Sequence, residues 1–353
     1  MEACLPSSLS LGGEGCTIPL RPYYDTIVHL QENTQAMPRT RWPFPPRPST
    51  RAFIDEARRT RGYSFFDWLH GYVYARWPYL YIGIGTGEHP WAPAVKGILG
   101  WIGRLSSPPT PADGRGPDVD FADTYHGKVV TLESATKLVT VDRAIDLRDL
   151  EHVIPYALAR DIVMKDPDHI VVLECPCRAA RAEPCLPLDV CLIIGEPFAS
   201  FVVEHHGRRA RWITPGEAVE ILRAEHERGH VHHAFFKDAM LGRFYAICNC
   251  CSCCCGAMQA YRNGVPMLAA SGYVSRVDAA LCAGCGACSE ACQFGAITVS
   301  DDRSAVNADL CMGCGVCVDR CEQEAMSLVR DESKGVPLEM DELMADSVPF
   351  GYC

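Results

Sequence analysis

Cysteine is the residue type that most constrains this chain. It occurs 21 times in 353 residues, and 18 of these cysteines lie between Cys175 and Cys321 in clusters with the spacing of metal ligands. A secreted disulfide framework and metal-bound thiolates are the two interpretations that such clusters allow. Disulfide scaffolds are usually short, and Met1 to Gly15 has neither the basic nor the apolar region of a secretory signal. We therefore expect thiolate-bound metal in an intracellular, cytoplasmic protein.

One internal repeat contains eight of these cysteines. Residues 282–297 and 311–326 follow the same C-x2-C-x2-C-x3-C pattern at an offset of 29 residues. The repeat predicts two copies of one small unit packed about a pseudo-twofold axis. Each copy has too few apolar residues to fold alone, so metal binding would supply folding free energy.

Residues 273–330 resemble the bacterial 2[4Fe-4S] ferredoxins, in which the fourth cysteine of each run ligates the other cluster. The resemblance implies a ferredoxin fold, two [4Fe-4S] clusters and single-electron transfer. Its implied ligands are Cys282, Cys285, Cys288 and Cys321 for cluster one, and Cys311, Cys314, Cys317 and Cys292 for cluster two. The family usually has proline after the fourth cysteine, whereas Gln293 and Glu322 stand here. Eight zinc thiolates are the alternative, although zinc sites rarely repeat this triple run.

Ten further cysteines lie upstream, far more than packing needs. They are Cys175, Cys177, Cys185 and Cys191, then Cys248, Cys250, Cys251, Cys253, Cys254 and Cys255. In an extended strand, Cys248, Cys250 and Cys254 would face one way and Cys251, Cys253 and Cys255 the other. Three thiolates on each face, completed from the first group, predict one or two additional iron–sulfur clusters. A zinc site and a redox-active thiol patch stay open as alternatives.

Two weaker resemblances concern this upstream block. Residues 170–258, from CPCR to CNCCSCCCG, resemble uncharacterised ferredoxin-type iron–sulfur proteins of anaerobes. Cys254-Cys255-Gly256 is similar to the CCG element of heterodisulfide-reductase-type proteins. Both imply metal and neither implies a reaction. We expect His230, His232 and His233 to be ordinary turn and helix-end residues and not ligands.

The chain predicts an α+β fold, with a C-terminal ferredoxin-like domain on a larger α+β N-terminal region. Residues 144–165 have apolar spacing typical of a helix, Ile170–Leu173 predicts a strand, and Thr214 can cap a helix that reaches Gly229. We divide the chain into a Pro/Arg-rich segment, an aromatic-rich region, a cysteine-rich iron–sulfur domain, a ferredoxin domain and a tail, at residues 1–60, 61–145, 146–270, 271–330 and 331–353.

The segment 39–103 is rich in arginine and aromatic residues, including Trp77, Trp91 and Trp101. Three hypotheses stay open for it: a buried aromatic core, a docking surface for a partner protein, and peripheral contact with a membrane. The run from Tyr72 to Gly85 is too short and too interrupted to span a bilayer. The glycines from Gly83 to Gly87 lack the spacing of a nucleotide-binding loop.

These features favour an electron-transfer iron–sulfur protein within a larger anaerobic redox system, whose partner would be a dehydrogenase, reductase or flavoprotein. The net charge of −11 argues against nucleic acid as a partner. One alternative is a catalytic oxidoreductase that uses the upstream cluster, with Arg178, His205 and His206 serving the substrate. Another is a peripheral membrane adaptor that passes electrons to quinone.

Overall fold

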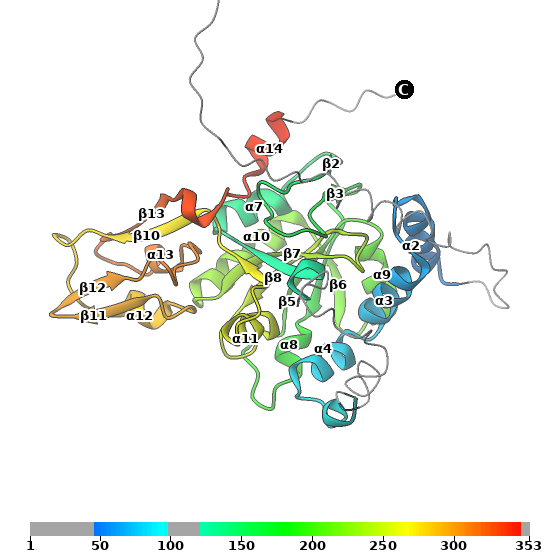
Figure 1. The fold of residues 1–353 in the computed structure, drawn as a ribbon, viewed down its shortest axis with the longest axis horizontal. Coiled ribbons are helices and arrows are strands. Elements are labelled where there is room, and N and C mark those ends of the chain that lie inside the picture. The colour runs from blue at the N-terminus through cyan, green and yellow to red at the C-terminus, as the bar shows by residue number, and fades with distance from the viewer. Residues whose placement is uncertain (1–45, 96, 98–120, 347–353) are drawn as a thin grey trace, which may run out of the picture.

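The computed structural model describes residues 46–95, 97 and 121–346. The predictions for residues 1–45, for Trp101 and for the last residues of the tail therefore lie outside the described residues. Helices and strands alternate irregularly along the chain, which confirms the α+β class (Figure 1).

The N-terminal part begins with three helices and continues as strands and helices that build one large sheet. In chain order its elements are α2 Pro48–Arg59, α3 Phe65–Arg76, α4 Pro78–Thr86, α6 Phe121–Thr124, β1 Tyr125–Val130, α7 Leu132–Val139, β2 Ile145–Leu147, β3 Ile162–Met164, β4 Ile170–Glu174, α8 Pro176–Ala179, β5 Asp189–Ile194, α9 Phe198–His206, β6 Ala210–Ile213, α10 Pro215–Glu227, β7 Val231–Lys237, β8 Arg243–Cys250, α11 Gly256–Arg262 and β9 Leu268–Ala269.

The main sheet has seven strands in the order β6-β4-β5-β8-β7-β1-β9. Its pairs are antiparallel except β1 with β9, which is parallel. β1 comes from the predicted 61–145 region and lies in the same sheet as strands of the predicted 146–270 region. The expected strand at Ile170–Leu173 is β4.

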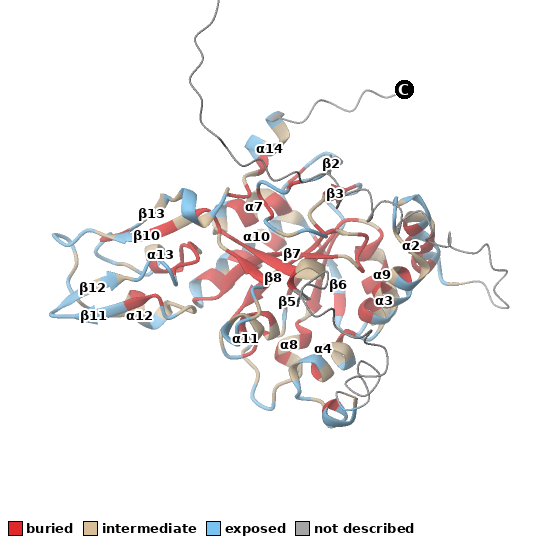
Figure 2. Cartoon of the chain, in the orientation of Figure 1, coloured by how far each residue is buried: buried red, intermediate tan, exposed pale blue. Residues whose placement is uncertain are grey.

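Both faces of this sheet are covered (Figure 2), so its strands alternate between two apolar cores. Val171, Leu173 and Ile193 pack with α2, α3, α9 and α11 on one face. Val172 and Leu192 pack with α7 and α10 on the other. The first of these cores also holds or contacts six of the ten upstream cysteines, which places these six thiols on that face of the sheet.

The C-terminal unit, residues 271–330, repeats one small motif. Its elements are β10 Tyr273–Val277, α12 Ala287–Ala291, β11 Ile297–Ser300, β12 Arg303–Val306, α13 Val316–Asp319 and β13 Met326–Arg330, followed by η1 Glu332–Lys334 and α14 Met340–Asp346. β10 pairs with β13 and β11 with β12, both antiparallel, so the strands of one repeat pair with those of the other. The unit projects from one end of the molecule (Figure 1).

Residues 144–165 do not form the expected helix. β2 and β3 pair as a short antiparallel ribbon, and Asp149 and Ala159 have φ angles of 54° and 55°, which an α-helix does not contain. Pro155 would also break a helix here. The apolar side chains that suggested a helix, including those of Leu150 and Ile154, lie outside regular helices and strands and are buried in the second core.

The helix from Thr214 is confirmed as α10. The Thr214 hydroxyl accepts a hydrogen bond from the Glu217 amide at 3.2 Å, and Gly229 beyond the helix end has a φ of +84°. The Glu217 carboxylate pairs with Arg211 at 2.6 Å. Gly83 and Gly85 lie inside α4, and no helix of the described part of the chain is long and apolar enough to cross a membrane.

Gly71 and Gly85 give a matched test of the packing of α3. A Cβ on buried Gly71 would meet the carbonyl oxygen of Ala239, whereas a Cβ on exposed Gly85 would meet nothing within 4 Å. We expect Gly71→Ala to lower the free energy of unfolding by about 1–3 kcal/mol and Gly85→Ala to raise it by up to about 1 kcal/mol. Urea unfolding of the anaerobically purified protein measures both, and equal shifts for the two variants would contradict the packing described.

Candidate metal centres

Six of the upstream cysteines surround one buried cavity of about 80 Å³, beside Tyr74, Tyr125 and Tyr245. We call them the six-thiol group: Cys175, Cys177, Cys191, Cys248, Cys250 and Cys255. Cys251 and Cys254 also reach the wall of this cavity. Four of the six side chains, those of Cys175, Cys191, Cys250 and Cys255, are buried in the core on the same face of the sheet as α9, and Cys177 and Cys248 pack against this core while half-buried. The tyrosines were not among the residues expected to meet the cysteines.

Strand pairing brings the six-thiol group together. Cys191 on β5 lies opposite Cys248 on β8, and Cys250 follows on the same face of β8 two residues later. Cys175 and Cys177 flank Pro176 where β4 passes into α8, and Cys255 precedes α11. The Cys255 and Cys250 sulfurs are 3.2 Å apart. Segments about 80 residues apart in the chain thus share one thiol site.

Cys175 and Cys191 of this group resist ionisation when no cation is near. The hydrogen bond with the Cys177 thiol, together with burial, raises the pKa of Cys175 to about 12. Contacts with the Cys175 and Cys248 thiols, together with burial, raise the pKa of Cys191 well above its ordinary value. Buried neighbouring thiolates need a positive partner, and a metal centre supplies it.

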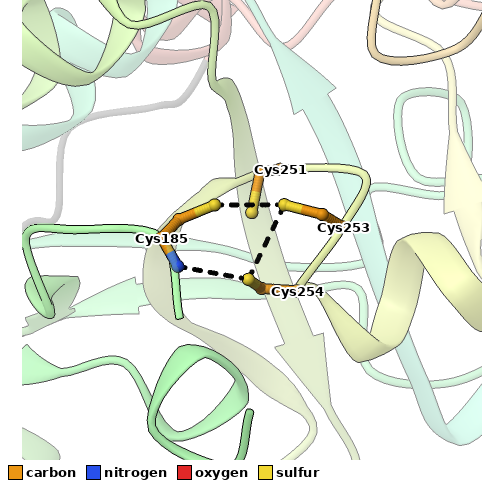
Figure 3. A group of neighbouring side chains, drawn as sticks. All are labelled: Cys185, Cys251, Cys253 and Cys254. Atoms are coloured by element: carbon orange, nitrogen blue, oxygen red, sulfur yellow. Dashed lines mark hydrogen bonds between the residues drawn. The ribbon is translucent and has the colours of Figure 1, made fainter. Parts of the chain in front are cut away.

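The other four upstream cysteines form a second cluster, shown in Figure 3, which we call the four-thiol group: Cys185, Cys251, Cys253 and Cys254. Their sulfur atoms all lie within 4.8 Å of one another. The Cys253 sulfur is 3.0 Å from that of Cys185 and 3.6 Å from that of Cys254. The Cys185 amide also donates to the Cys254 sulfur at 3.5 Å.

This partition differs from the one expected of an extended strand. β8 ends at Cys250, and residues 252–254 form a turn. The alternation of faces stops there, because successive side chains of a turn do not alternate. Cys255 therefore returns to the side of Cys250, while Cys254 joins Cys251 and Cys253. The expected pairing of Cys254 with Cys248 and of Cys255 with Cys251 is wrong.

Arg178 and the histidines are held by the protein itself. The buried Arg178 guanidinium lies 2.5 Å from the Glu225 carboxylate and donates to the Pro187 and Asn249 carbonyls. His205 faces the Thr50 hydroxyl, and His206 faces the Ala75 carbonyl. Arg178 also lines the six-thiol cavity, and the substrate role that the catalytic alternative gives these three residues stays a prediction.

The three histidines near the upstream block divide between a turn and a strand. His230 contacts Glu225 at 2.7 Å, so it belongs to the turn after α10. His232 and His233 lie buried in β7, and burial lowers the pKa of His232 to about 4 and that of His233 to about 3. None of the three is among the residues that line the six-thiol cavity in the described chain.

The eight cysteines of the repeat form two quartets, each around its own small cavity. One cavity is lined by Cys282, Cys285, Cys288 and Cys321, and the other by Cys292, Cys311, Cys314 and Cys317. These are the two sets that the resemblance implies, with the fourth cysteine exchanged between repeats. The assignment of each cysteine as a ligand stays a prediction.

In each quartet, a glycine lets the cysteine loop pass very close to a neighbouring backbone segment. Gly284 and Gly313 both have a φ of +65°, and a Cβ there would meet the Asp302 and Tyr273 carbonyls respectively. Burial raises the pKa of Cys314 to about 12 and that of Cys317 to about 11. The second quartet thus combines a tight loop with two buried thiols whose raised pKa values a positively charged metal centre would offset.

The comparisons with known proteins agree with this geometry. Residues 281–326 match the model of the 4Fe-4S dicluster domain. The chain carries a ferredoxin-type domain. No curated protein and no solved structure matches the chain. The match does not reach the six-thiol and four-thiol groups, which rest on their geometry alone.

Two serines of the ferredoxin domain contact its cysteines in the same way. The Ser275 hydroxyl lies 3.1 Å from the Cys317 sulfur, and the Ser304 hydroxyl lies 3.2 Å from the Cys288 sulfur. The Ser275 and Ser304 amides donate at 3.4 Å to the Cys311 and Cys282 sulfurs. The serines are 29 residues apart, so the repeat also reproduces the hydrogen bonds that tune a cluster.

The ferredoxin domain is anchored to the main sheet beside its second quartet. The Gln293 side chain accepts from the Ser252 amide at 2.8 Å and donates to the Gly229 carbonyl at 2.9 Å. Phe294, Met312 and Cys314 pack against the core that holds the six-thiol group. The sequence marked Gln293 only as a departure from proline, and the fold gives it this contact.

Ser304→Ala should lower the midpoint potential of cluster one, because a hydroxyl donor stabilises the extra negative charge of the reduced state. A hydrogen bond of about 0.5–1.5 kcal/mol corresponds to a shift of about 20–60 mV for one electron. Redox titration followed by electron paramagnetic resonance measures it. Ser275→Ala is the matched control and should shift the other signal, so a shift of the same signal by both variants would refute the assignment.

Proposed function

We propose that this chain is an iron–sulfur electron-transfer protein of a larger anaerobic redox complex. Electrons would pass between the two ferredoxin-type clusters and one upstream cluster in the six-thiol cavity. The observation that carries this proposal is the contact of Gln293 with Ser252 and Gly229, directly after Cys292. It joins the second quartet to the turn of residues 252–254, which contains Cys253 and Cys254 and directly precedes Cys255 of the six-thiol group.

When bound, [4Fe-4S] clusters supply carriers that accept and release one electron at a time. The chain's own residues ligate, shield and position them. Val316 and Met312 are almost fully buried beside the second quartet and exclude water from it. Further contacts hold α13 against α10: His226 Nε2 lies 2.6 Å from the Asp319 carboxylate, and Arg320 donates to the Glu227 carbonyl.

The outer end of the ferredoxin domain supports a docking role toward a partner. Cys285 is exposed, and so are the nearby apolar side chains of Leu281 and Val299. The first quartet therefore lies near solvent, whereas the second lies against the main sheet. A redox protein such as a dehydrogenase, reductase or flavoprotein would bind at this outer end, in the cytoplasm.

A catalytic role is the second candidate, and the six-thiol group favours it. One cubane needs four thiolates. The six cysteines around this cavity would therefore either hold a larger cluster or leave two thiols free of the cluster. Tyr74 and Tyr245 hydroxyls are 2.7 Å apart in the wall of that cavity, where they could contact a small substrate. A cluster signal that changes on addition of substrate would distinguish an enzyme from a carrier.

The arginine and aromatic segment, residues 39–103, gives weaker support to a third role, that of a peripheral membrane adaptor. Trp68 and Tyr74 are buried in the core, whereas Phe66, Trp77 and Trp91 are 77%, 45% and 65% exposed. The exposed side chains suit a partner surface or the interface of a membrane, where a peripheral adaptor would meet quinone. Flotation with anionic vesicles, compared between the wild type and Phe66→Ser, would detect that contact.

Metal content tests the presence of the upstream cluster. We expect the anaerobically purified protein to contain clearly more than about eight irons and eight acid-labile sulfides per chain, because two cubanes account for eight of each. Elemental analysis with a sulfide assay gives both numbers. A content of about eight would confine the clusters to the ferredoxin domain and end the relay proposal.

Gln293→Ala tests the path between the domains. Both ferredoxin clusters should still form, but electron transfer from them to the upstream cluster should slow several-fold, because two hydrogen bonds that hold the domain are lost. Rapid-freeze paramagnetic resonance after reduction follows this step. Glu322→Ala changes the equivalent, exposed position of the second repeat and should leave the rate unchanged. Equal rates in Gln293→Ala and the wild type would refute the path.

A further inference from the structure

We propose that the four-thiol group binds a single tetrahedral metal ion, Zn²⁺ or mononuclear iron, without bridging sulfide. The proposal concerns Cys185, Cys251, Cys253 and Cys254, and it goes beyond the electron relay, which needs a cluster only in the six-thiol cavity. For these four cysteines it favours a single-ion site, such as the zinc site that the sequence left open, over a second upstream iron–sulfur cluster.

The sulfur spacing is the first argument. Four thiolates at about 2.3 Å from one tetrahedral ion lie about 3.8 Å from one another. The sulfurs of this group are all within 4.8 Å, and two of the pairs are 3.0 and 3.6 Å apart. The thiolates of a cubane sit on four different irons and enclose the whole cluster, so they stand farther apart.

The ferredoxin quartets provide a comparison within the same molecule. Each of them surrounds a cavity. Within the described residues, the four cysteines of the four-thiol group have sulfur atoms that all lie within 4.8 Å of one another. The sulfur atoms of neither ferredoxin quartet lie that close together. The sulfur atoms of the two quartets therefore have the wider spacing that clusters need, and those of the four-thiol group have the closer spacing that a single ion needs.

The surroundings fit a centre with excess negative charge. Four thiolates around a divalent ion leave a net charge of −2, which nearby donors and cations must offset. The Cys185 amide donates to the Cys254 sulfur, and the Arg181 guanidinium donates to the Cys254 carbonyl at 3.2 Å. Cys251 and Cys254 also have the two-residue spacing that structural zinc sites use.

Such an ion would have a structural role at the junction of the molecule. Cys185 comes from the loop between α8 and β5, whereas the other three come from the turn after β8. The ion would tie these two segments together. The same turn presents the Ser252 amide to Gln293, so it also carries the ferredoxin domain.

Two cysteine variants separate the ion from the clusters. We expect Cys253→Ser, which alters the exposed ligand, to lose about one metal ion per chain while iron–sulfur content, measured as acid-labile sulfide, stays at the wild-type level. Cys285→Ser, in the ferredoxin domain, should lose iron and sulfide and keep the ion. Glu183→Gln, an exposed change in the loop of Cys185, is the control and should keep all of them.

The outcome decides both the site and its metal. Loss of zinc alone, or of one iron without sulfide, would support the single-ion site. Loss of several irons with matching sulfide from folded Cys253→Ser would overturn it in favour of a cluster. The relay has its own tests in the total iron content and in the rate of the Gln293 variant, so the two proposals can fail separately.

A measurement on the unaltered protein guards against a variant that does not fold. X-ray absorption of the full chain should show the ion with four sulfur neighbours at about 2.3 Å and no second metal near it. For zinc this is read at the zinc edge; zinc with oxygen or nitrogen ligands would overturn the proposal. So would a preparation that holds neither zinc nor mononuclear iron.

Discussion

The antiparallel pairing of β5 with β8 is the constraint on which the upstream chemistry depends. It sets Cys191 opposite Cys248, and the two-residue period of β8 adds Cys250 on the same face. A shift of one residue in this register would turn these thiols toward the other core. The central place of β5 and β8 in the sheet, between strands on either side, holds the register.

The buried ion pair of Arg178 with Glu225 supports the CPCR turn, which carries Cys175 and Cys177 of the six-thiol group. Arg178 follows Cys177 and is 1% exposed, and its guanidinium reaches Glu225 on α10 and the Asn249 carbonyl on β8. His230 contacts the same Glu225 carboxylate. The residue before it, Gly229, accepts the hydrogen bond from the Gln293 side chain through its carbonyl oxygen. Because a buried charge without its partner is costly, this network ties the CPCR turn, α10 and the approach to the ferredoxin domain into one arrangement.

The sequence predicted best where the structure is local or repeated. The exchange of Cys292 and Cys321 between quartets is implied by the repeat and its family resemblance, and α10 follows from Thr214 and Pro215 at its start. Prediction failed at residues 144–165, where burial against the second core produced apolar spacing that imitates a helix. It failed again at Cys254 and Cys255, because nothing local shows that β8 ends at Cys250.

The sequence by itself indicated that this chain binds metal, because its cysteines cluster at the spacing of metal ligands, and the resemblance of its repeat to ferredoxins implied how the eight cysteines of that repeat are divided. Only the tertiary structure decided how the upstream ten separate into groups of six and four, and that Gln293 meets the turn between them. Those contacts join segments distant in the chain. Sheet register and domain packing set such distances, and neither is written in the spacing of neighbouring residues.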